Sequence, residues 1–288
     1  MVVVYIGVIA SVSHGLHDSN DLSVFNVAAF ISKPLWEFFQ TLALRYRPVN
    51  LDVLPLYILL LATFAPVLWL MVRKPTLILV CSIAVYLAGR HFGWNLSASR
   101  SAVWYFNPFA WQLLFFLGAW TALGGAQPVQ SIARTRTVVW LAVAYLVFAL
   151  VETTAIKAPH WGNLLPTWML APFDPNDKTN LAPYRILHLI ALAIVATRFL
   201  PADSPVLKWR SLAPLIKCGQ NSLPVFCTGI VLSFCAHAAI EKSLNSLWVQ
   251  IVAGVTGVVL MTAVAYYRDW LRQRQRIFAS PLVFGDVA

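Results

Sequence analysis

Seven long apolar runs, separated by polar connectors, dominate this chain. They are residues 51–72, 76–92, 106–123, 137–156, 184–201, 221–240 and 247–267. A helix that crosses a membrane needs about 20 predominantly apolar residues, and it pairs its own backbone polar groups, as lipid requires. Only 11% of the residues are charged, against roughly 25% in soluble domains. The runs therefore predict an all-α fold, a polytopic transmembrane helix bundle with seven full spans.

A shorter apolar stretch, residues 2–13, precedes these runs. As a helix it would rise only about 18 Å, which is well short of the roughly 30 Å hydrocarbon core. We expect it to be a partial span, the far half of a helix whose first half lies upstream of Met1. The expected organisation is an N-terminally incomplete membrane domain, residues 1–267, followed by a basic cytoplasmic tail, residues 268–288.

The distribution of charge predicts the orientation. The even-numbered connectors and the tail carry 12 of the 21 Lys and Arg residues but only three of the 11 acidic ones. Cytoplasmic loops of membrane proteins carry an excess of Lys and Arg, so we expect this face and the C-terminus to be cytoplasmic. The tail is expected to rest on anionic headgroups of the bilayer, and no nucleic-acid partner is expected.

Costly polar residues collect at the predicted outer ends of six spans. They are Asp52, Arg90, His91, Asn107, Gln112, Glu152, Arg185, His188 and His237. Ionisable groups in a bilayer usually face the bundle interior or a wet cavity, so this convergence predicts a polar pocket that opens outward. The alternatives are snorkelling arginines at the interface and an ordinary aromatic belt. The four cysteines form no CxxC pair and no metal-ligand spacing occurs, so no metal site is expected. On these grounds alone, transporter, channel and enzyme all remain open.

Four segments resemble one known family. They are RYRPVNLDVLPLYILLL (45–61), GWNLSASRSAVWYFNPFAWQLLFFLGAW (93–120), DKTNLAPYRILHLIAL (177–192) and CGQNSLPVFCTGIVLSFCAH (218–237). In this order they are similar to OpgC, or MdoC, the succinyltransferases of osmoregulated periplasmic glucans, which are related to the acyltransferase 3 membrane enzymes. The resemblance implies about ten helices in the bacterial inner membrane. It also implies transfer of succinyl from succinyl-CoA, which is a donor and not a bound cofactor, to the glucose hydroxyls of a glucan.

The resemblance suggests a role for each candidate residue. The catalytic candidates are Arg90, Arg185 and His188. The candidates for glucan binding are Trp94, Asn95, Trp104, Asn107, Gln112, Asp177, Lys178 and Asn180. The candidates on the donor side are Asn221 and Ser222. Guanidinium groups suit a carboxylate or an oxyanion, and aromatic rings with amides suit a sugar.

The sequence also departs from the family pattern. The Asp-His pair that ends the family's first helix, and the Ser-Gly-Tyr segment before its second, are not found here. The proposed catalytic base of related acyltransferases is the first-helix histidine, so we expect a chain that lacks two and a half helices and is inactive or unstable by itself. The competing hypotheses are a polytopic transporter and a non-catalytic membrane protein that binds glucan.

Overall fold

The computed structural model describes residues 5–11, 27–46, 51–98, 102–157, 177–201, 204–243 and 246–279. Residues 5–11 are helical, and the remaining elements are helices as well. They are α3 (Ala28–Ser32), α4 (Pro34–Leu42), α5 (Val53–Arg73), α6 (Pro75–Phe92), α7 (Pro108–Ala122), α8 (Gln127–Ala133), α9 (Arg136–Lys157), α12 (Pro183–Phe199), η3 (Pro205–Lys208), α13 (Ala213–Gln220), α14 (Ser222–Lys242) and α15 (Leu247–Ala279). Within the described ranges the one β contact is an isolated bridge between Ser97 and Val103. The all-α prediction is confirmed.

Each of the seven apolar runs forms a helix, but not every helix is long enough to span a membrane. In the described ranges five helices are long and apolar enough, namely α5, α6, α9, α14 and α15. The count reaches six if α7 and α8, which meet at 96°, form one broken span. The predicted count of seven is therefore not confirmed. The reason lies in α7 and α12, which have only 15 and 17 residues.

Helix α7 stops early because the chain turns sharply after it. Gly124 has φ +81°, a left-handed conformation that only glycine adopts readily. The α8 helix then begins at Gln127. The predicted run, residues 106–123, extends past both ends of α7, and the bend that follows the helix was missed.

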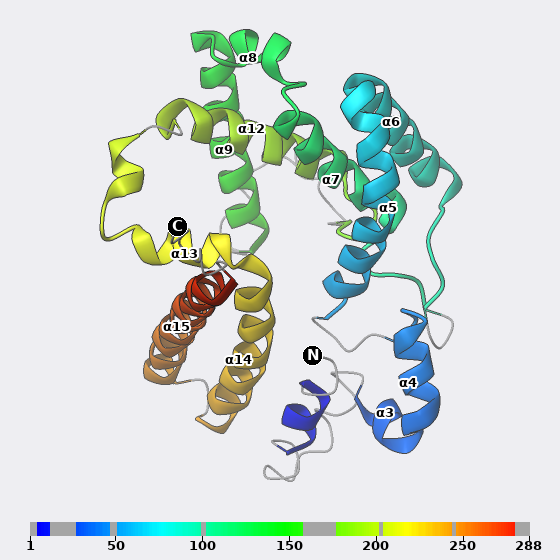
Figure 1. The fold of residues 1–288 in the computed structure, drawn as a ribbon, viewed down its shortest axis with the longest axis vertical. Helices are drawn as coiled ribbons and strands as arrows, with labels where there is room; N and C mark the ends of the chain where they lie inside the picture. The colour runs from blue at the N-terminus through cyan, green and yellow to red at the C-terminus, as the bar shows by residue number, and fades with distance from the viewer. Residues whose placement is uncertain are drawn as a thin grey trace, which may run out of the picture. The chain divides into compact units, whose positions relative to one another are not determined.

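Two compact units make up the chain, and each is described by itself. The first comprises residues 1–33, 48–50 and 203–288, and the second comprises residues 34–47 and 51–202. Helices α4 to α12 belong to the second unit, and α3 and α13 to α15 belong to the first (Figure 1).

The second unit is built around close packing of α6 on α7. A side-chain carbon added at Gly89 would lie 3.1 Å from Cβ of Phe109, so glycine permits the approach of the two helices. Gln112 and Ser82 pair inside this interface: the Ser82 hydroxyl donates to Oε1 of Gln112 at 2.6 Å, and Nε2 donates to the Ser82 carbonyl at 2.9 Å. Both polar groups are thereby satisfied away from water, as buried polar groups require. Gln112 thus holds the two helices together.

The first unit is built from α13, α14 and α15. Lys217 on α13 forms an ion pair with Asp269 on α15. The helical residues 5–11 join this unit through Tyr5, whose ring meets that of Phe234 edge-on at 6.4 Å. Helix α15 continues without a break through residues 268–279, so the first part of the predicted tail extends the last helix. Residues 2–4, 12–13 and 280–288 of the predicted N-terminal span and tail lie outside the described residues.

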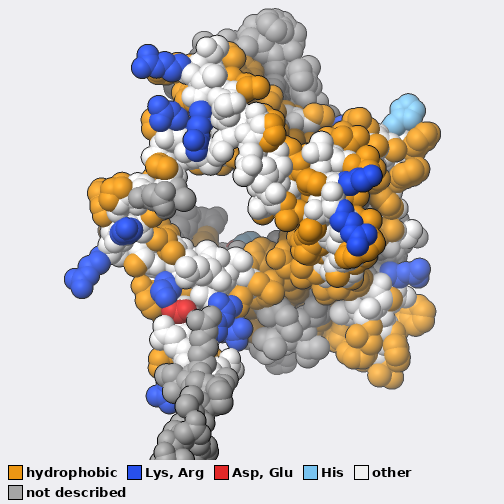
Figure 2. All heavy atoms as spheres, turned by 45° about the horizontal axis from the view of Figure 1, so that its top comes forward, with side chains coloured by type: hydrophobic (Ala, Val, Ile, Leu, Met, Phe, Trp, Pro, Cys, Tyr) orange, Lys and Arg blue, Asp and Glu red, His pale blue; other side chains and the backbone are white. Residues whose placement is uncertain are grey.

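Large hydrophobic side chains cover the outside of the candidate spans. Figure 2 shows them over much of the visible face, and no more than 17% of the residues in any span window are buried. Trp140, Trp248 and Val72 are among those that are at least 65% exposed. A water-soluble protein rarely exposes so much contiguous apolar surface. The surface therefore agrees with the membrane location that the apolar runs predict.

Candidate functional site

The loop of residues 177–182, which precedes α12, adopts a tight and partly strained conformation. The carboxylate of Asp177 accepts from the Asn180 backbone N–H at 3.0 Å and from its side-chain amide at 3.2 Å. Leu181 has φ +50°, a left-handed conformation that costs a non-glycine residue roughly 1–2 kcal/mol. Contacts from elsewhere in the unit must hold this loop in place.

Helix α6 supplies the first of these contacts. Nη1 of Arg90 donates to the Asn180 carbonyl at 3.0 Å and lies 3.8 Å from the carboxylate of Asp177. One turn earlier, the hydroxyl of Tyr86 donates to the Leu181 carbonyl at 2.8 Å. The Leu181 side chain is buried in the hydrophobic core between α6 and α7. These bonds fix the strained part of the loop to one face of α6.

The start of α7 supplies the second set, centred on Asn107. Its Oδ1 accepts from the Phe109 backbone N–H at 3.0 Å, as in a helix N-cap. Its Nδ2 donates to the Trp94 carbonyl at 2.6 Å and to Oδ1 of Asn180 at 2.9 Å. Its backbone N–H donates to the Thr179 carbonyl at 3.1 Å. One buried residue therefore joins the start of α7, the end of α6 and the loop.

Trp111 completes the attachment of the loop. Its indole Nε1 lies 3.1 Å from the Lys178 carbonyl and 3.3 Å from the Thr179 carbonyl, and donates to both. We refer to the residues that attach the loop as the loop cluster: Tyr86, Arg90, Trp94, Asn107, Trp111, Asp177 and Asn180. Sequence analysis missed Tyr86 and Trp111. Tyr86 could have been found because it lies one turn from Arg90 on the same helix face.

The segment between α6 and α7 folds back on itself through Asn95. Its Nδ2 donates to the Trp104 carbonyl at 2.9 Å, and its Oδ1 accepts from the Leu96 N–H at 2.7 Å. The Trp104 ring is buried in a hydrophobic cluster with Leu56 and Leu60 of α5. The polar atoms of Asn95, which is half-buried, are thus bound to this segment itself, and Trp104 is buried.

Other predicted residues in and beside the loop cluster are exposed. The Trp94 ring is 46% exposed and stacks on Phe92 with centroids 5.6 Å apart. The side chains of Arg90 and Asp177 are about one-third exposed, and Lys178 is exposed. By contrast, Asn107, Trp104 and Gln112 are buried. The accessible groups thus include an aromatic ring, two cations and a carboxylate.

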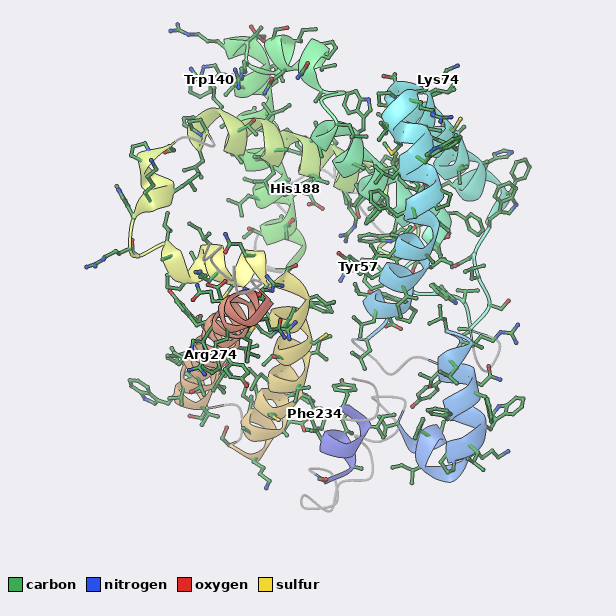
Figure 3. The ribbon with its side chains drawn as sticks, viewed as in Figure 1. Tyr57, Lys74, Trp140, His188, Phe234 and Arg274 are labelled. Atoms are coloured by element: carbon green, nitrogen blue, oxygen red, sulfur yellow. The ribbon has the colours of Figure 1, made fainter. Side chains whose placement is uncertain are left out.

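Arg185 and His188 lie on α12, just beyond the loop, where that helix packs on α9. The Tyr145 hydroxyl of α9 donates to the Tyr184 carbonyl at 2.9 Å. The rings of Tyr145 and His188 have centroids 6.3 Å apart, and His188 is exposed (Figure 3). The Arg185 guanidinium lies 5.9 Å from the ring of Tyr184. The loop and the start of α12 therefore place Arg90, Arg185 and His188 in the same unit.

The donor-side candidates belong to the first unit. Asn221 is buried, and its amide donates to the carbonyls of Lys217 at 3.1 Å and Ala265 at 3.4 Å. Ser222, the first residue of α14, is exposed. His237 lies 3.4 Å from Glu241 on the same helix. Asn221 thus joins α13 to α15, and Ser222 is the more accessible of the two candidates.

Cysteines and acidic groups do not assemble a metal site in the described part of the chain. No cluster of three or more His, Cys, Asp or Glu side chains there has the geometry to hold a metal ion. The loop cluster instead combines hydrogen-bonding and charged groups with three aromatic residues, Tyr86, Trp94 and Trp111.

Comparison with known proteins identifies one family. A family model described as OpgC protein matches residues 1–273. Searches of curated proteins and of solved structures return no match. The match covers every helix of both units up to the last turns of α15.

Proposed function

Because this chain belongs to the OpgC family, a family of glucan-modifying, acyltransferase-like membrane proteins, we propose that it succinylates a periplasmic glucan. The donor is succinyl-CoA and the acceptor is a glucose hydroxyl. The observation that carries the proposal is the surface around the loop. Arg90 and Asp177 lie 3.8 Å apart there with about one-third of each side chain exposed, and Trp94, whose carbonyl binds Asn107, exposes 46% of its surface.

Each exposed residue has a role in this proposal. The face of Trp94 supports a glucose ring, while Asp177 and Lys178 bind its hydroxyls. The guanidinium groups of Arg90 and Arg185 hold the succinyl carboxylate or stabilise the oxyanion, because their fork of N–H donors matches both. Asn95, Trp104, Asn107, Gln112 and Asn180 act indirectly, because their polar groups bind the protein itself.

The chemical step is an acyl transfer. The sugar hydroxyl oxygen attacks the thioester carbonyl, a C–O bond forms, the C–S bond breaks, and the proton passes through a base to the CoA thiolate. A positioned base typically contributes 10²- to 10⁴-fold to such a rate. The resemblance gives the role of base to a first-helix histidine, so His188, which is exposed one turn from Arg185, is a catalytic candidate without an assigned proton-transfer step. Ser222 is the candidate contact for the donor.

The proposal requires a particular sidedness. The chain lies in the bacterial inner membrane, with the loop cluster on the periplasmic side and the C-terminus in the cytoplasm. This sidedness depends on α12, because its 17 residues follow the loop directly. If α12 does not cross the bilayer, the loop and the C-terminus lie on the same side of the membrane.

Reporter fusions test the sidedness. A fluorescent protein fused after Ala288 is expected to fluoresce, and alkaline phosphatase at the same position is expected to be inactive, because the former folds in the cytoplasm and the latter in the periplasm. Alkaline phosphatase inserted after Lys178 is expected to be active. An active phosphatase at both positions would show that α12 does not span.

A transfer assay tests the function itself. Membranes containing the chain are incubated with radiolabelled succinyl-CoA and a neutral periplasmic glucan, and label on the glucan is measured. Label above that of membranes without the chain is the expected result.

A second function is glucan binding without chemistry. It is favoured by the exposed Trp94 ring, which needs no donor to bind a sugar. Retention on immobilised glucan without label transfer would support this second function and overturn the first.

A further inference from the structure

A cavity of about 410 Å³ lies where the beginning of α9 meets the end of α12. It is lined by Arg136, Val139, Trp140, Val143, Arg198 and Phe199. Arg136 is the first residue of α9, and Arg198 is in the last turn of α12. The two antiparallel helices thus bring two arginines to one opening. This opening lies at the end of α12, whereas the loop cluster lies at its start.

No acidic side chain of the described residues pairs with either arginine. Both arginines are exposed. Arg90, by comparison, faces Asp177, and Lys217 faces Asp269. Two cations at one opening repel each other, and at a membrane they attract an anion. The charge at this opening is therefore complementary to an anionic ligand.

The walls below the arginines are apolar and partly aromatic. Val139 is buried, whereas Trp140 and Phe199 are 70% and 68% exposed. Trp140 is labelled in Figure 3. Trp residues concentrate at the membrane–water interface, where their rings meet both headgroups and acyl chains. A ligand that fills this cavity has an anionic end for the arginines and a hydrocarbon part for the walls.

We propose that this cavity binds an anionic phospholipid. The phosphate lies between Arg136 and Arg198, because guanidinium groups bind phosphate oxygens in a bidentate manner. One acyl chain runs along Val139, Val143 and Phe199. In the proposed orientation this end of α9 lies at the cytoplasmic leaflet, whose anionic lipids attract basic residues. The inference goes beyond the proposed function and holds whether or not the chain transfers succinyl groups.

Lipid binding by the purified full chain tests the proposal. Native mass spectrometry and thermal unfolding are measured in detergent with added phosphatidylglycerol, phosphatidylcholine or CoA. Phosphatidylglycerol is expected to be retained and to raise the unfolding temperature, while phosphatidylcholine is not. The double variant Arg136→Gln/Arg198→Gln is expected to bind phosphatidylglycerol at least about tenfold more weakly, because it loses two charge-assisted contacts.

Two further variants separate the cavity from general surface charge. Arg134→Gln removes an exposed arginine that does not line the cavity, and it is expected to bind like the wild type. Val143→Phe keeps both arginines but fills the apolar wall, and it is expected to weaken binding. Equal losses in Arg134→Gln and the double variant would overturn the proposal, as would unchanged binding in the double variant. Stabilisation by CoA and not by phosphatidylglycerol would assign the cavity to the acyl donor instead.

Discussion

Replacing Arg185 with alanine is expected to abolish glucan succinylation while the chain still accumulates in the membrane. The guanidinium supplies positive charge at the start of α12, directly after the loop that carries Asp177 and Asn180. Loss of a single charge-stabilising group in an acyl-transfer site typically costs 10²- to 10³-fold in rate. The measurement is the transfer of labelled succinyl to glucan, together with the negative charge of glucans recovered from cells.

Two companion variants show whether the loss of activity comes from the loss of the Arg185 guanidinium group. Arg185→Lys keeps the charge but loses the fork of donors, so an intermediate rate is expected. Arg134→Ala removes an exposed arginine at the C-cap of α8, and a wild-type rate is expected. Glucans of unchanged negative charge in Arg185→Ala would refute the assignment. A large fall in unfolding temperature would instead indicate a structural role for Arg185.

Replacing Asn107 with leucine is expected to destabilise the second unit by about 3 kcal/mol. The variant loses the N-cap bond to the Phe109 N–H and both amide bonds, to the Trp94 carbonyl and to Oδ1 of Asn180. Asn107 is only 1% exposed, so water does not readily replace these bonds. Thermal unfolding of the purified chain in detergent measures the effect. Glucan binding is expected to fall as well, because the loop loses its attachment to α7.

Asn107→Ser separates the cap from the attachment of the loop. Serine is also a good N-cap, so this variant keeps an acceptor for the Phe109 N–H and loses both amide bonds. An unfolding temperature between those of the wild type and Asn107→Leu is expected. If all three proteins unfold at the same temperature, the central role of Asn107 in the loop cluster is wrong.

The apolar runs predicted the helices well because lipid imposes a simple rule on sequence. All seven runs are helical, and Asn107-Pro108 marked the start of α7. The number of spans was harder to predict. Hydropathy does not register the turn at Gly124, and α12 ends at Phe199, two residues before the end of the predicted run. A difference of a few residues decides whether such a helix reaches across the bilayer.

The candidate site was predicted in part. Arg90, Trp94, Asn107, Asp177 and Asn180 were all named from the sequence, and the structure brings them together. Their individual roles could not be predicted in the same way. The sequence around an asparagine is the same whether its amide binds a ligand or a backbone carbonyl of the protein. Only the packing of the helices distinguishes the two cases.

By itself the sequence determined that this chain is helical and lies in a membrane, and its segments placed it in its family, because apolar length and motif order are properties of the linear chain. Tertiary structure alone decided that Asn107 and Gln112 serve the protein's own packing, that Trp94 remains exposed, and that Arg136 and Arg198 share one cavity. These facts depend on which helix faces meet. Helix contacts depend on crossing geometry and on small residues such as Gly89, at positions far apart in the sequence.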